Sequence, residues 1–316
     1  MKFTDCDKLI SIIIPVHNTA DFVSDCLSSV LSQDHANFEV LIIDDGSTDG
    51  STEICEKFAA REPRIRLYKN ENHGVSFSRN FGIKHSRGDY ITFIDSDDTV
   101  APNYLSVLLY SLISADADMS AAGYDCFAEF GSPVYNDNDE VSVKTKELET
   151  VFFTETQGMV WSKLFKKNII ENHSLLFDES IAVNEDLVFN LEYVRHCGCV
   201  SVSSAKVYGY RQRENSAVRN TVSLKWFTCL KVYKRLFNNY SENAVFSYIL
   251  YYYLKNLYEA KYAVKKNQYN CRDIGTDIYA DIKTAEKKKS VLTPKQRIRL
   301  FICKHFFFII EKRRKI

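Results

Sequence analysis

The sequence lacks any apolar run long enough to cross a membrane. A membrane-spanning helix needs about 18 to 20 consecutive apolar residues, and no segment of the 316 residues approaches that length. The first residues also lack a basic region followed by a long apolar stretch, so we expect neither a signal peptide nor a transmembrane start. These absences favour a protein that works on the cytoplasmic side of the cell membrane.

The chain also lacks net charge, because its 41 Lys and Arg residues balance its 41 Asp and Glu residues. This balance argues against a nucleic-acid-binding protein, which normally carries a basic excess. The nine cysteines are irregularly spaced and odd in number, unlike the even framework of a small secreted domain. Cys197 and Cys199 form the only close pair, and they lack a second pair of ligands at zinc-binding spacing. A reducing cytoplasm is therefore expected.

Buried strands alternate with amphipathic helices in the N-terminal half. Residues 10–16 and 38–43 are continuous apolar runs, typical of strands buried on both faces. Between them, apolar residues recur at intervals of three and four, which predicts a helix. Further strands are predicted at residues 65–68 and 90–94, and further helices around 54–58 and 75–86. The alternation predicts an α/β fold with an open, mostly parallel sheet flanked by helices.

The C-terminal part has a different pattern. Residues 131–140 form a polar, turn-rich insertion, and residues 222–265 contain neither proline nor glycine. The second stretch is rich in Tyr, Leu, Lys and Asn, which predicts two or more helices. We expect a first domain over residues 1–220 and a helical region over residues 221–316.

An acidic cluster, Asp95, Asp97 and Asp98, follows the apolar strand at residues 90–94. Open α/β sheets bind ligands beyond the carboxyl ends of their strands, so these carboxylates are expected at the binding edge. Like charges this close need a counter-ion, and oxygen ligands suit Mg²⁺ or Mn²⁺ bridged to substrate phosphates. The alternative is structural: Asp98 or Thr99 caps the helix after Pro102 and the rest is a turn.

Four stretches occur in an order that resembles one known enzyme family. They are residues 11–18, 40–49, 78–80 and 88–98. Together they resemble the family 2 inverting glycosyltransferases of GT-A fold, of the polysaccharide or capsule type. The resemblance is close over about residues 9 to 125, thinner to about residue 220, and says nothing about the last hundred residues.

The resemblance implies roles for individual residues at the binding edge. Contacts with the base, ribose or phosphates of a nucleoside diphosphate fall to Pro15, Val16, Asn18, Asp44, Asp45, Arg79 and Asp95. The metal ligands would be Asp97, Asp95 and Asp98. For Arg79 the alternative is a surface ion pair with Asp95 or Asp45, and Asp49 suits the structural role of capping the next helix better than Asp44 does.

Further along the chain, Glu185 and Asp186 resemble the acidic element that supplies the general base in this family. An inverting transfer needs a base, because a sugar hydroxyl is a poor nucleophile until its proton leaves. Asp186 is the preferred base and Glu185 its rival. The alternative is an ordinary helix start, in which Asn184 caps the helix and two acids favour its dipole.

Two weaker matches complete the predicted site. Trp161 lies in a segment that flanks the acceptor in the family, although its ring can equally belong to the core. Arg211 and Arg213 lie in a stretch that resembles the loop closing over the diphosphate, where either arginine would bind phosphate. Many relatives carry histidine in that loop, which leaves the identity of this ligand open.

The tail at residues 295–316 combines aromatic and aliphatic side chains with basic residues on both sides. This composition is typical of a helix that lies in a membrane interface, with Lys and Arg near anionic headgroups. The alternative is a core helix that ends in a solvated basic tail. We expect peripheral association with the inner face of the cell membrane.

The predicted reaction moves a sugar from a nucleoside diphosphate donor, expected to be a UDP-sugar, to a hydroxyl of a glycan or lipid-linked acceptor in polysaccharide biosynthesis. The sequence carries no Gln-Xaa-Xaa-Arg-Trp element, which favours a distributive enzyme over a processive synthase. One alternative is a catalytically silent nucleotide-sugar-binding or scaffolding protein of the same fold. A sugar-1-phosphate nucleotidyltransferase is disfavoured, because no Gly-rich phosphate loop follows the first strand.

Overall fold

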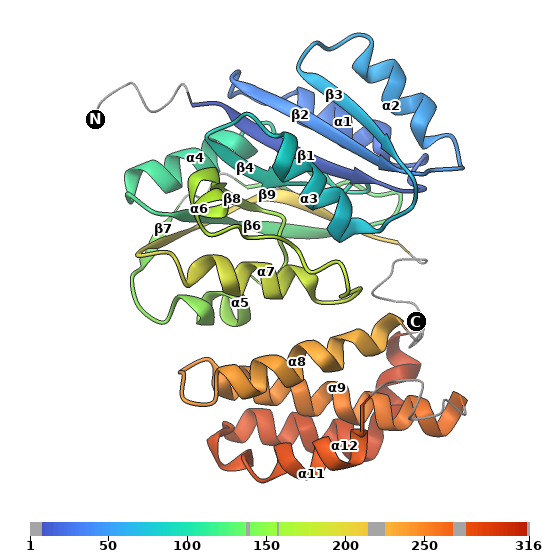
Figure 1. Cartoon of the computed structure of the whole chain (residues 1–316), viewed down its shortest axis with the longest axis vertical. Helices are drawn as coiled ribbons and strands as arrows, with labels where there is room; N and C mark the ends of the chain where they lie inside the picture. The colour runs from blue at the N-terminus through green and yellow to red at the C-terminus, as the bar shows by residue number, and fades with distance from the viewer. Residues whose placement is uncertain (1–7, 137–139, 157, 214–224, 268–275, 315–316) are drawn as a thin grey trace. The chain divides into compact units, whose positions relative to one another are not determined.

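The computed structural model describes residues 8–136, 140–156, 158–213, 225–267 and 276–314, with side chains up to residue 305 in the last helix (Figure 1). The chain divides into two compact units. The first comprises Met1–Glu179 and Glu185–Glu214, and the second Ser180–Asn184 and Asn215–Ile316. The domain boundary expected between residues 220 and 221 lies outside the described residues.

In the described residues of the first unit, nine strands form a single sheet (Figure 1). The order is β3-β2-β1-β4-β8-β6-β9-β5, and β7 pairs with β9. The strand bounds are β1 Ile10–Val16, β2 Phe38–Asp45, β3 Ile65–Asn70, β4 Tyr90–Phe93, β5 Thr99–Val100, β6 Met119–Ala128, β7 Val141–Lys144, β8 Lys163–Lys166 and β9 Val200–Gln212.

The predicted parallel sheet is confirmed for the N-terminal half. Strands β1 to β4 pair in parallel, with Ile12 of β1 opposite Val40 of β2 and Thr92 of β4. Strand β8 then runs antiparallel to both β4 and β6, and β9 runs parallel to β6. The sheet as a whole is therefore mixed, and its parallel half is the part that the alternating sequence pattern predicts.

Helices cover both faces of this sheet. Side chains alternate between the faces of a strand. Ile12 and Ile14 of β1 accordingly join the core cluster that also includes buried residues of α1 and α4, while Ile13 lies against Gly82 of α3 on the other face. The helix bounds are α1 Val23–Leu31, α2 Ser51–Ala59, α3 Val75–His85, α4 Tyr104–Ser114, α5 Val151–Thr154, α6 Lys167–Asn172 and α7 Glu185–Val194, with the short 3-10 turn η2 at Leu148–Thr150.

The second unit is helical in its described residues, which confirms the predicted helices after residue 222. Its helices are α8 Thr228–Asn239, α9 Phe246–Asn267, α11 Ile278–Glu286 and α12 Pro294–Arg314, with 3-10 turns η3 at Lys225–Phe227 and η4 at Lys289–Val291. Helix α9 contacts each of the other three helices, and Ile249, Leu254 and Leu257 on it are fully buried. Among the described residues, none of the helices has the length and apolar character needed to span a bilayer.

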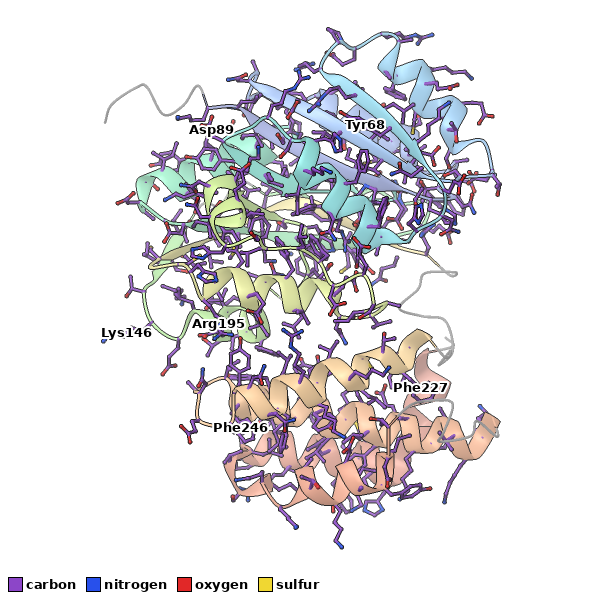
Figure 2. All side chains as sticks on the ribbon, viewed as in Figure 1. Tyr68, Asp89, Lys146, Arg195, Phe227 and Phe246 are labelled. Carbon is purple, nitrogen blue, oxygen red and sulfur yellow. The ribbon has the colours of Figure 1, made fainter. Side chains whose placement is uncertain are left out.

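Figure 2 shows how side chains fill the space between the sheet and its helices. Helix α3 packs so closely on β1 that its contact residue there must be a glycine. A Cβ atom added to Gly82 would overlap the side chain of Ile13. The missing side chain therefore lets α3 approach the sheet, and α3 carries Arg79 to the edge of the sheet.

Replacing Gly82 with alanine is expected to destabilise the first unit, because the new methyl group must displace Ile13. Overpacking of this kind costs about 1 to 3 kcal/mol, which outweighs the gain of about 1 kcal/mol in helix propensity. Urea unfolding measures the difference. Gly198→Ala is the matched control, because its Cβ would lie 3.8 Å from the nearest atom, Oδ2 of Asp118. Equal unfolding midpoints for the two variants would contradict the close packing of α3.

Candidate active site

The polar segments that follow β1, β2, β4 and β9 meet at one edge of the sheet. Because β1, β2 and β4 are parallel, their carboxyl ends share that edge. Asp89, labelled in Figure 2, marks the opposite edge at the amino end of β4, where it pairs with Lys8 at 3.3 Å. The acidic cluster and its partners therefore belong to the carboxyl edge, as expected for a ligand site in an open α/β sheet.

The loops after β1 and β2 are joined by hydrogen bonds. The N–H of Asn18 donates to Oγ of Ser47 at 3.1 Å, and Oδ1 of Asn18 accepts from the N–H of Thr48 at 2.8 Å. Asn18 has φ 52, in the left-handed region that Asn tolerates better than most residues. Pro15 and Val16 precede this loop in β1, and Val16 is buried. Asn18 therefore shapes the turn beside the predicted nucleotide pocket.

Asp44 and Asp45 lie at the end of β2 and both are buried. Oδ1 of Asp44 accepts from the N–H of Ser47 at 3.1 Å, and Oδ2 accepts from Oγ1 of Thr52 at 2.5 Å. Asp45 accepts from the backbone N–H groups at the start of α3, with Oδ1 to His73 at 2.9 Å and Oδ2 to Gly74 at 2.6 Å. Asp45 therefore fixes the loop that leads into α3. Nucleotide contact for either aspartate stays a prediction.

A buried arginine connects three acids of the edge. Arg79 of α3 is 3% exposed, and its Nη2 lies 3.1 Å from Oδ1 of Asp95. Its Nη1 lies 3.0 Å from Oε1 of Glu185 and 2.5 Å from Oδ1 of Asp186. Burial alone would lower the pKa of Arg79, but the charges of Asp186, Asp95 and Glu185 raise it above its ordinary value. The guanidinium therefore stays charged and holds acids from two separate segments together.

This network decides between the ion pairs that were the alternative for Arg79, one with Asp95 and one with Asp45. The pair with Asp95 is present, but it is buried rather than on the surface, and Asp45 binds the α3 loop instead. Because the guanidinium already serves three carboxylates, its burial disfavours direct nucleotide contact, which stays a prediction.

Asp98 has a structural role in the acidic cluster. Oδ2 accepts from the hydroxyl of Tyr208 at 2.6 Å and Oδ1 from the N–H of Arg211 at 2.8 Å. Burial raises the pKa of Asp98 well above its ordinary value, and Asp97 and Asp95 add to that shift. The capping alternative is wrong: α4 begins at Tyr104, its N-cap is Asn103, and the Asp98 carboxylate binds β9 instead. With both oxygens bound to protein groups and only 1% of its surface exposed, Asp98 is poorly placed to ligate a metal.

The two arginines of β9 and its extension differ in availability. Arg211 is 5% exposed, and its guanidinium donates to the carbonyl oxygens of Asp97 at 2.8 Å and Glu129 at 2.6 Å. Nε of Arg213 lies 2.7 Å from Oδ2 of Asp97, and its side chain is 23% exposed. Between the two predicted phosphate ligands, Arg213 is therefore the better placed.

Asp95 and Asp97 suit a divalent cation whose remaining ligands come from the substrate and water. Their side chains are 30% and 19% exposed, and both come from the loop after β4. Among the described residues, no cluster of three or more His, Cys, Asp or Glu side chains could enclose a metal by itself. Mg²⁺ is typically held by one or two carboxylates plus substrate phosphates and water, which this pair can accommodate. Arg213 already places a positive charge against Asp97, as a cation there would.

Asp186 has the surroundings of a general base. It is 8% exposed near the start of α7, and its Oδ2 accepts from the N–H of Val160 at 3.1 Å. Burial raises the pKa of Asp186 to about 7; Arg79 opposes this shift, whereas Glu185 and Asp95 add to it. A carboxyl with a pKa near the working pH transfers protons efficiently. The helix start that formed the alternative is also present, because α7 begins at Glu185.

Trp161 lies in the core cluster in this structure. It is 4% exposed, and its ring stacks on Tyr208 at a centroid distance of 4.6 Å and on Tyr210 at 5.5 Å. This burial favours the core alternative, and acceptor contact stays a prediction.

Tyr208 and Lys163 are residues of the edge to which the sequence reasoning assigned no role. The Tyr208 hydroxyl donates to Asp98 and accepts from the N–H of Asp95 at 3.2 Å. Lys163 is buried beside Leu164 and Phe165, and a charged residue at the start of an apolar strand is a signal that could have found it.

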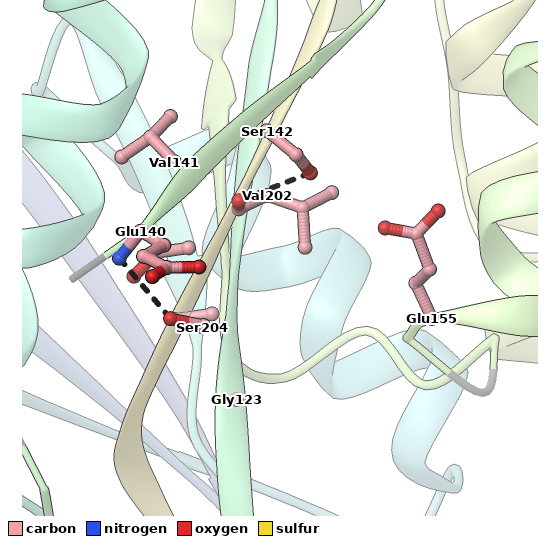
Figure 3. A pocket seen from close by; sticks show the side chains of 9 residues that line it. Gly123, Glu140, Val141, Ser142, Glu155, Val202 and Ser204 are labelled. Carbon is pink, nitrogen blue, oxygen red and sulfur yellow. Dashed lines mark hydrogen bonds between the residues drawn. The ribbon is translucent and has the colours of Figure 1, made fainter. Parts of the chain in front are cut away.

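A pocket with a volume of about 450 Å³ lies elsewhere in the first unit, around β6, β7 and β9 (Figure 3). Figure 3 shows the hydrogen bonds of Glu140 and Ser142 to β9, with Glu155 on the opposite side. None of the predicted site residues lines this pocket. The acidic edge is therefore the better candidate site, because it gathers the charged groups.

Known proteins resemble this chain in both sequence and fold. The model of the family described as Glycosyl transferase family 2 matches residues 11–170. The uncharacterised glycosyltransferase EpsJ of Bacillus subtilis is 33% identical over 219 residues, 66% of this chain and 62% of that protein. The glycosyltransferase GlyA of Streptococcus pneumoniae is 32% identical over 235 residues, 71% of this chain. The chain spans about 62% of EpsJ and 33% of GlyA.

Two solved structures share the fold at low sequence identity. TarS of S. aureus, residues 1–349 in complex with UDP-GlcNAc, gives a TM-score of 0.69 at 19% identity, covering 98% of this chain and 90% of that one. The mannosyltransferase PcManGT from Pyrobaculum calidifontis, in complex with GDP-Man and Mn²⁺, gives a TM-score of 0.60 at 13% identity, covering 97% and 86%.

Replacing Arg79 with methionine leaves Asp95, Glu185 and Asp186 without their cation. Arg79 opposes the raised pKa of Asp186, so its removal raises that pKa further in the folded state, and the loss of stability grows as the pH rises above the unfolded pKa of that carboxyl. We expect unfolding free energy to fall by about 3 to 5 kcal/mol near neutral pH and by less at about pH 5. Urea unfolding at both pH values measures this loss.

Arg64→Met is the control for this variant. Arg64 pairs with Glu62 at 2.8 Å, but both side chains are partly exposed, so the expected loss is about 0 to 1 kcal/mol. A similar loss for both variants would show that burial does not determine how much the Arg79 network contributes to the free energy of unfolding.

Proposed function

The chain belongs to glycosyl transferase family 2, and we propose that it transfers a sugar from a nucleoside diphosphate sugar to a hydroxyl group. Its fold is the GT-A fold of that family. The proposed donor is a UDP-sugar, and the proposed acceptor is a glycan or a lipid-linked glycan of cell-surface polysaccharide synthesis. UDP-GlcNAc named for TarS, and GDP-Man with Mn²⁺ named for PcManGT, support a nucleotide-sugar donor and a divalent cation.

The bridge formed by Arg79 is the observation that carries this proposal. It joins Asp95, a candidate metal ligand, to Asp186, the candidate base. A single-displacement transfer needs a cationic site for the leaving diphosphate and a base for the acceptor, held at a fixed spacing. One buried guanidinium that binds both acids supplies that spacing.

The proposed chemistry uses these positions. The Asp186 carboxylate accepts the proton of the acceptor hydroxyl as its oxygen attacks the anomeric carbon. The bond from that carbon to the diphosphate breaks on the opposite face, which inverts the configuration. A divalent cation bound by Asp95 and Asp97 would neutralise the charge that develops on the diphosphate. Arg213 adds a guanidinium for the same charge.

The loops after β1 and β2 are the proposed nucleoside pocket. Each oxygen of Asp44 accepts one hydrogen bond from the protein and keeps a lone pair that can accept from a base imide or a ribose hydroxyl. Asn18 and Asp45 hold the surrounding loops in place. We therefore propose that Asn18 and Asp45 contribute to nucleoside binding by fixing the shape of these loops as well as by direct contact.

The alternative function is a silent nucleotide-sugar-binding protein of the same fold. Asp97, Glu185 and Asp186 are present and gathered at one edge, and a silent protein has no need to keep all three. The transferase is therefore preferred, and a turnover measurement separates the two.

Helix α12 supports the proposed membrane association. Ile298, Phe301 and Ile302 are 63%, 58% and 42% exposed, and their spacing places them on one face of the helix. Leu300 and Cys303 on the other face are buried. The exposed Arg297, Arg299 and Lys304 flank the apolar stripe, which is the arrangement of an interfacial helix near anionic lipids. The side chains of residues 306–316 lie outside the described residues.

Turnover is tested by release of the nucleoside diphosphate from a panel of UDP- and GDP-sugars, with mixed glycan acceptors, with and without Mn²⁺. We expect one donor to be consumed in a cation-dependent way. Asp97→Ala removes a cation ligand and Asp186→Asn removes the base, and each is expected to lower turnover by about 10²- to 10⁴-fold.

Asp89→Ala is the control for this screen, because Asp89 lies at the opposite edge of the sheet and should leave turnover unchanged. Wild type that is inert with every donor but still binds UDP would favour the silent binding protein. Full turnover by Asp186→Asn would reject Asp186 as the base.

Membrane association is tested with the double variant Ile298→Ser, Phe301→Ser, which removes exposed apolar surface and leaves Leu300 and Cys303 buried. Wild type is expected to sediment with vesicles that contain anionic lipid, and the variant to do so much more weakly. Val143→Ser is the control, since Val143 is 49% exposed on β7. Equal sedimentation of all three proteins would contradict the proposal.

A further inference from the structure

A buried lysine lies beside the proposed base. Lys163, the first residue of β8, is 1% exposed. A buried ammonium group is costly unless its donors are bound. Burial lowers the pKa of Lys163 to about 7, and the nearby charge of Asp186 opposes this shift. No step of the proposed transfer involves Lys163.

Lys163 binds the backbone turn that precedes it. Its Nζ donates to the carbonyl oxygen of Met159 at 2.5 Å and to that of Trp161 at 3.4 Å. The N–H of Val160 donates to Oδ2 of Asp186 at 3.1 Å. The carbonyl of Met159 and the N–H of Val160 belong to one planar trans peptide group, in which they point in opposite directions. A single peptide group therefore connects Lys163 to Asp186.

The same turn is also held from α7. Asn190, fully buried and one helical turn after Asp186, donates to the carbonyl oxygens of Gly158 at 2.8 Å and Met159 at 3.0 Å. Gly158 has φ 72 and Ser162 has φ 55, so both ends of the turn lie in the left-handed region. The direction of the central N–H group is fixed together with the turn.

We propose that Lys163 is a positioning residue for the transfer reaction: by binding the carbonyl of Met159, it directs the N–H of Val160 at Asp186 and fixes the orientation of that carboxylate. The inference rests on the proposed role of Asp186 as the base. A hydrogen bond to a carbonyl polarises its peptide group and strengthens the N–H as a donor. Asp186 is then held from two sides, by Arg79 through Oδ1 and by this peptide group through Oδ2.

The charged groups that face Asp186 in the described part of the chain come from several elements. Arg79 approaches from α3, Glu185 from α7 itself, Asp95 from the loop after β4 and Lys163 from β8. Arg79 binds Asp186 directly and also serves the other two acids, whereas Lys163 reaches Asp186 through the backbone. A change at Lys163 therefore leaves the arginine network in place.

The test uses the full chain with Lys163→Met, and Lys163→Gln as a second variant that keeps a donor without the charge. Lys167→Met is the control, since Lys167 also donates to a carbonyl oxygen, that of Ser86 at 2.8 Å, but away from Asp186. With the donor found in the screen, we expect Lys163→Met to lower kcat by about 10-fold with little change in donor KM. We also expect it to move the acidic limb of the kcat profile to higher pH, with partial recovery in Lys163→Gln.

A purely structural role would lower kcat equally at all pH values or change only thermal stability, and either result in a folded variant would overturn the proposal. Asp186→Asn is measured in parallel. If Asp186→Asn is inactive and Lys163→Met behaves like wild type, this inference fails alone. If Asp186→Asn is fully active, the proposed base fails with it.

A measurement on the wild type covers the case in which neither lysine variant folds. The Met159 carbonyl carbon and the Val160 amide nitrogen are followed by NMR from about pH 5 to about pH 9, a range that spans the titration of a carboxyl with a raised pKa. Both nuclei are expected to shift with a common inflection that Asp186→Asn abolishes. Shifts that are absent, or unchanged in Asp186→Asn, would overturn the proposal without any change at Lys163.

Discussion

The buried guanidinium of Arg79 is the interaction on which the acidic edge of the first unit depends. Asp95, Glu185 and Asp186 repel one another, and two of them come from a helix more than eighty residues further along the chain than the strand that positions the third. A buried cation that meets all three removes most of that repulsion, although desolvation of the charges offsets part of the gain. The acids can therefore lie close together.

The surrounding structure serves to bring that guanidinium to the edge. Gly82 allows α3 to pack closely on β1, and Asp45 holds the backbone at the start of α3 through two N–H groups. On the other side of the cluster, Tyr208 and the backbone of Arg211 bind Asp98, which ties the loop after β4 to β9. These contacts leave Asp95 and Asp97 as the partly exposed carboxylates of the cluster.

The same contacts separate the residues that shape the site from those proposed to bind ligand or accept a proton. Arg79, Asp98, Arg211 and Trp161 have little exposed surface and several partners within the protein, so they shape the site. Asp97 and Arg213 pair with each other and keep exposed surface, which suits the cation and phosphate contacts proposed for them. Asp186 lies between these groups: it is largely buried, yet its pKa near 7 suits a proton acceptor.

Periodicity in the sequence was enough to predict the parallel half of the sheet, the helices of the second unit and the segments that meet at the carboxyl edge, because strand and helix patterns are local. The family resemblance singled out Asp95, Asp97 and Asp186 for the same reason: it is carried by short motifs.

Only the tertiary structure decided the partners of these residues. It showed that Arg79 binds three acids, that Asp98 binds β9 instead of capping α4, and that Lys163 lies beside Asp186. Burial and ion pairing bring together residues far apart in the chain, 107 positions for Arg79 and Asp186 and 110 for Asp98 and Tyr208, and no local pattern records which of them meet.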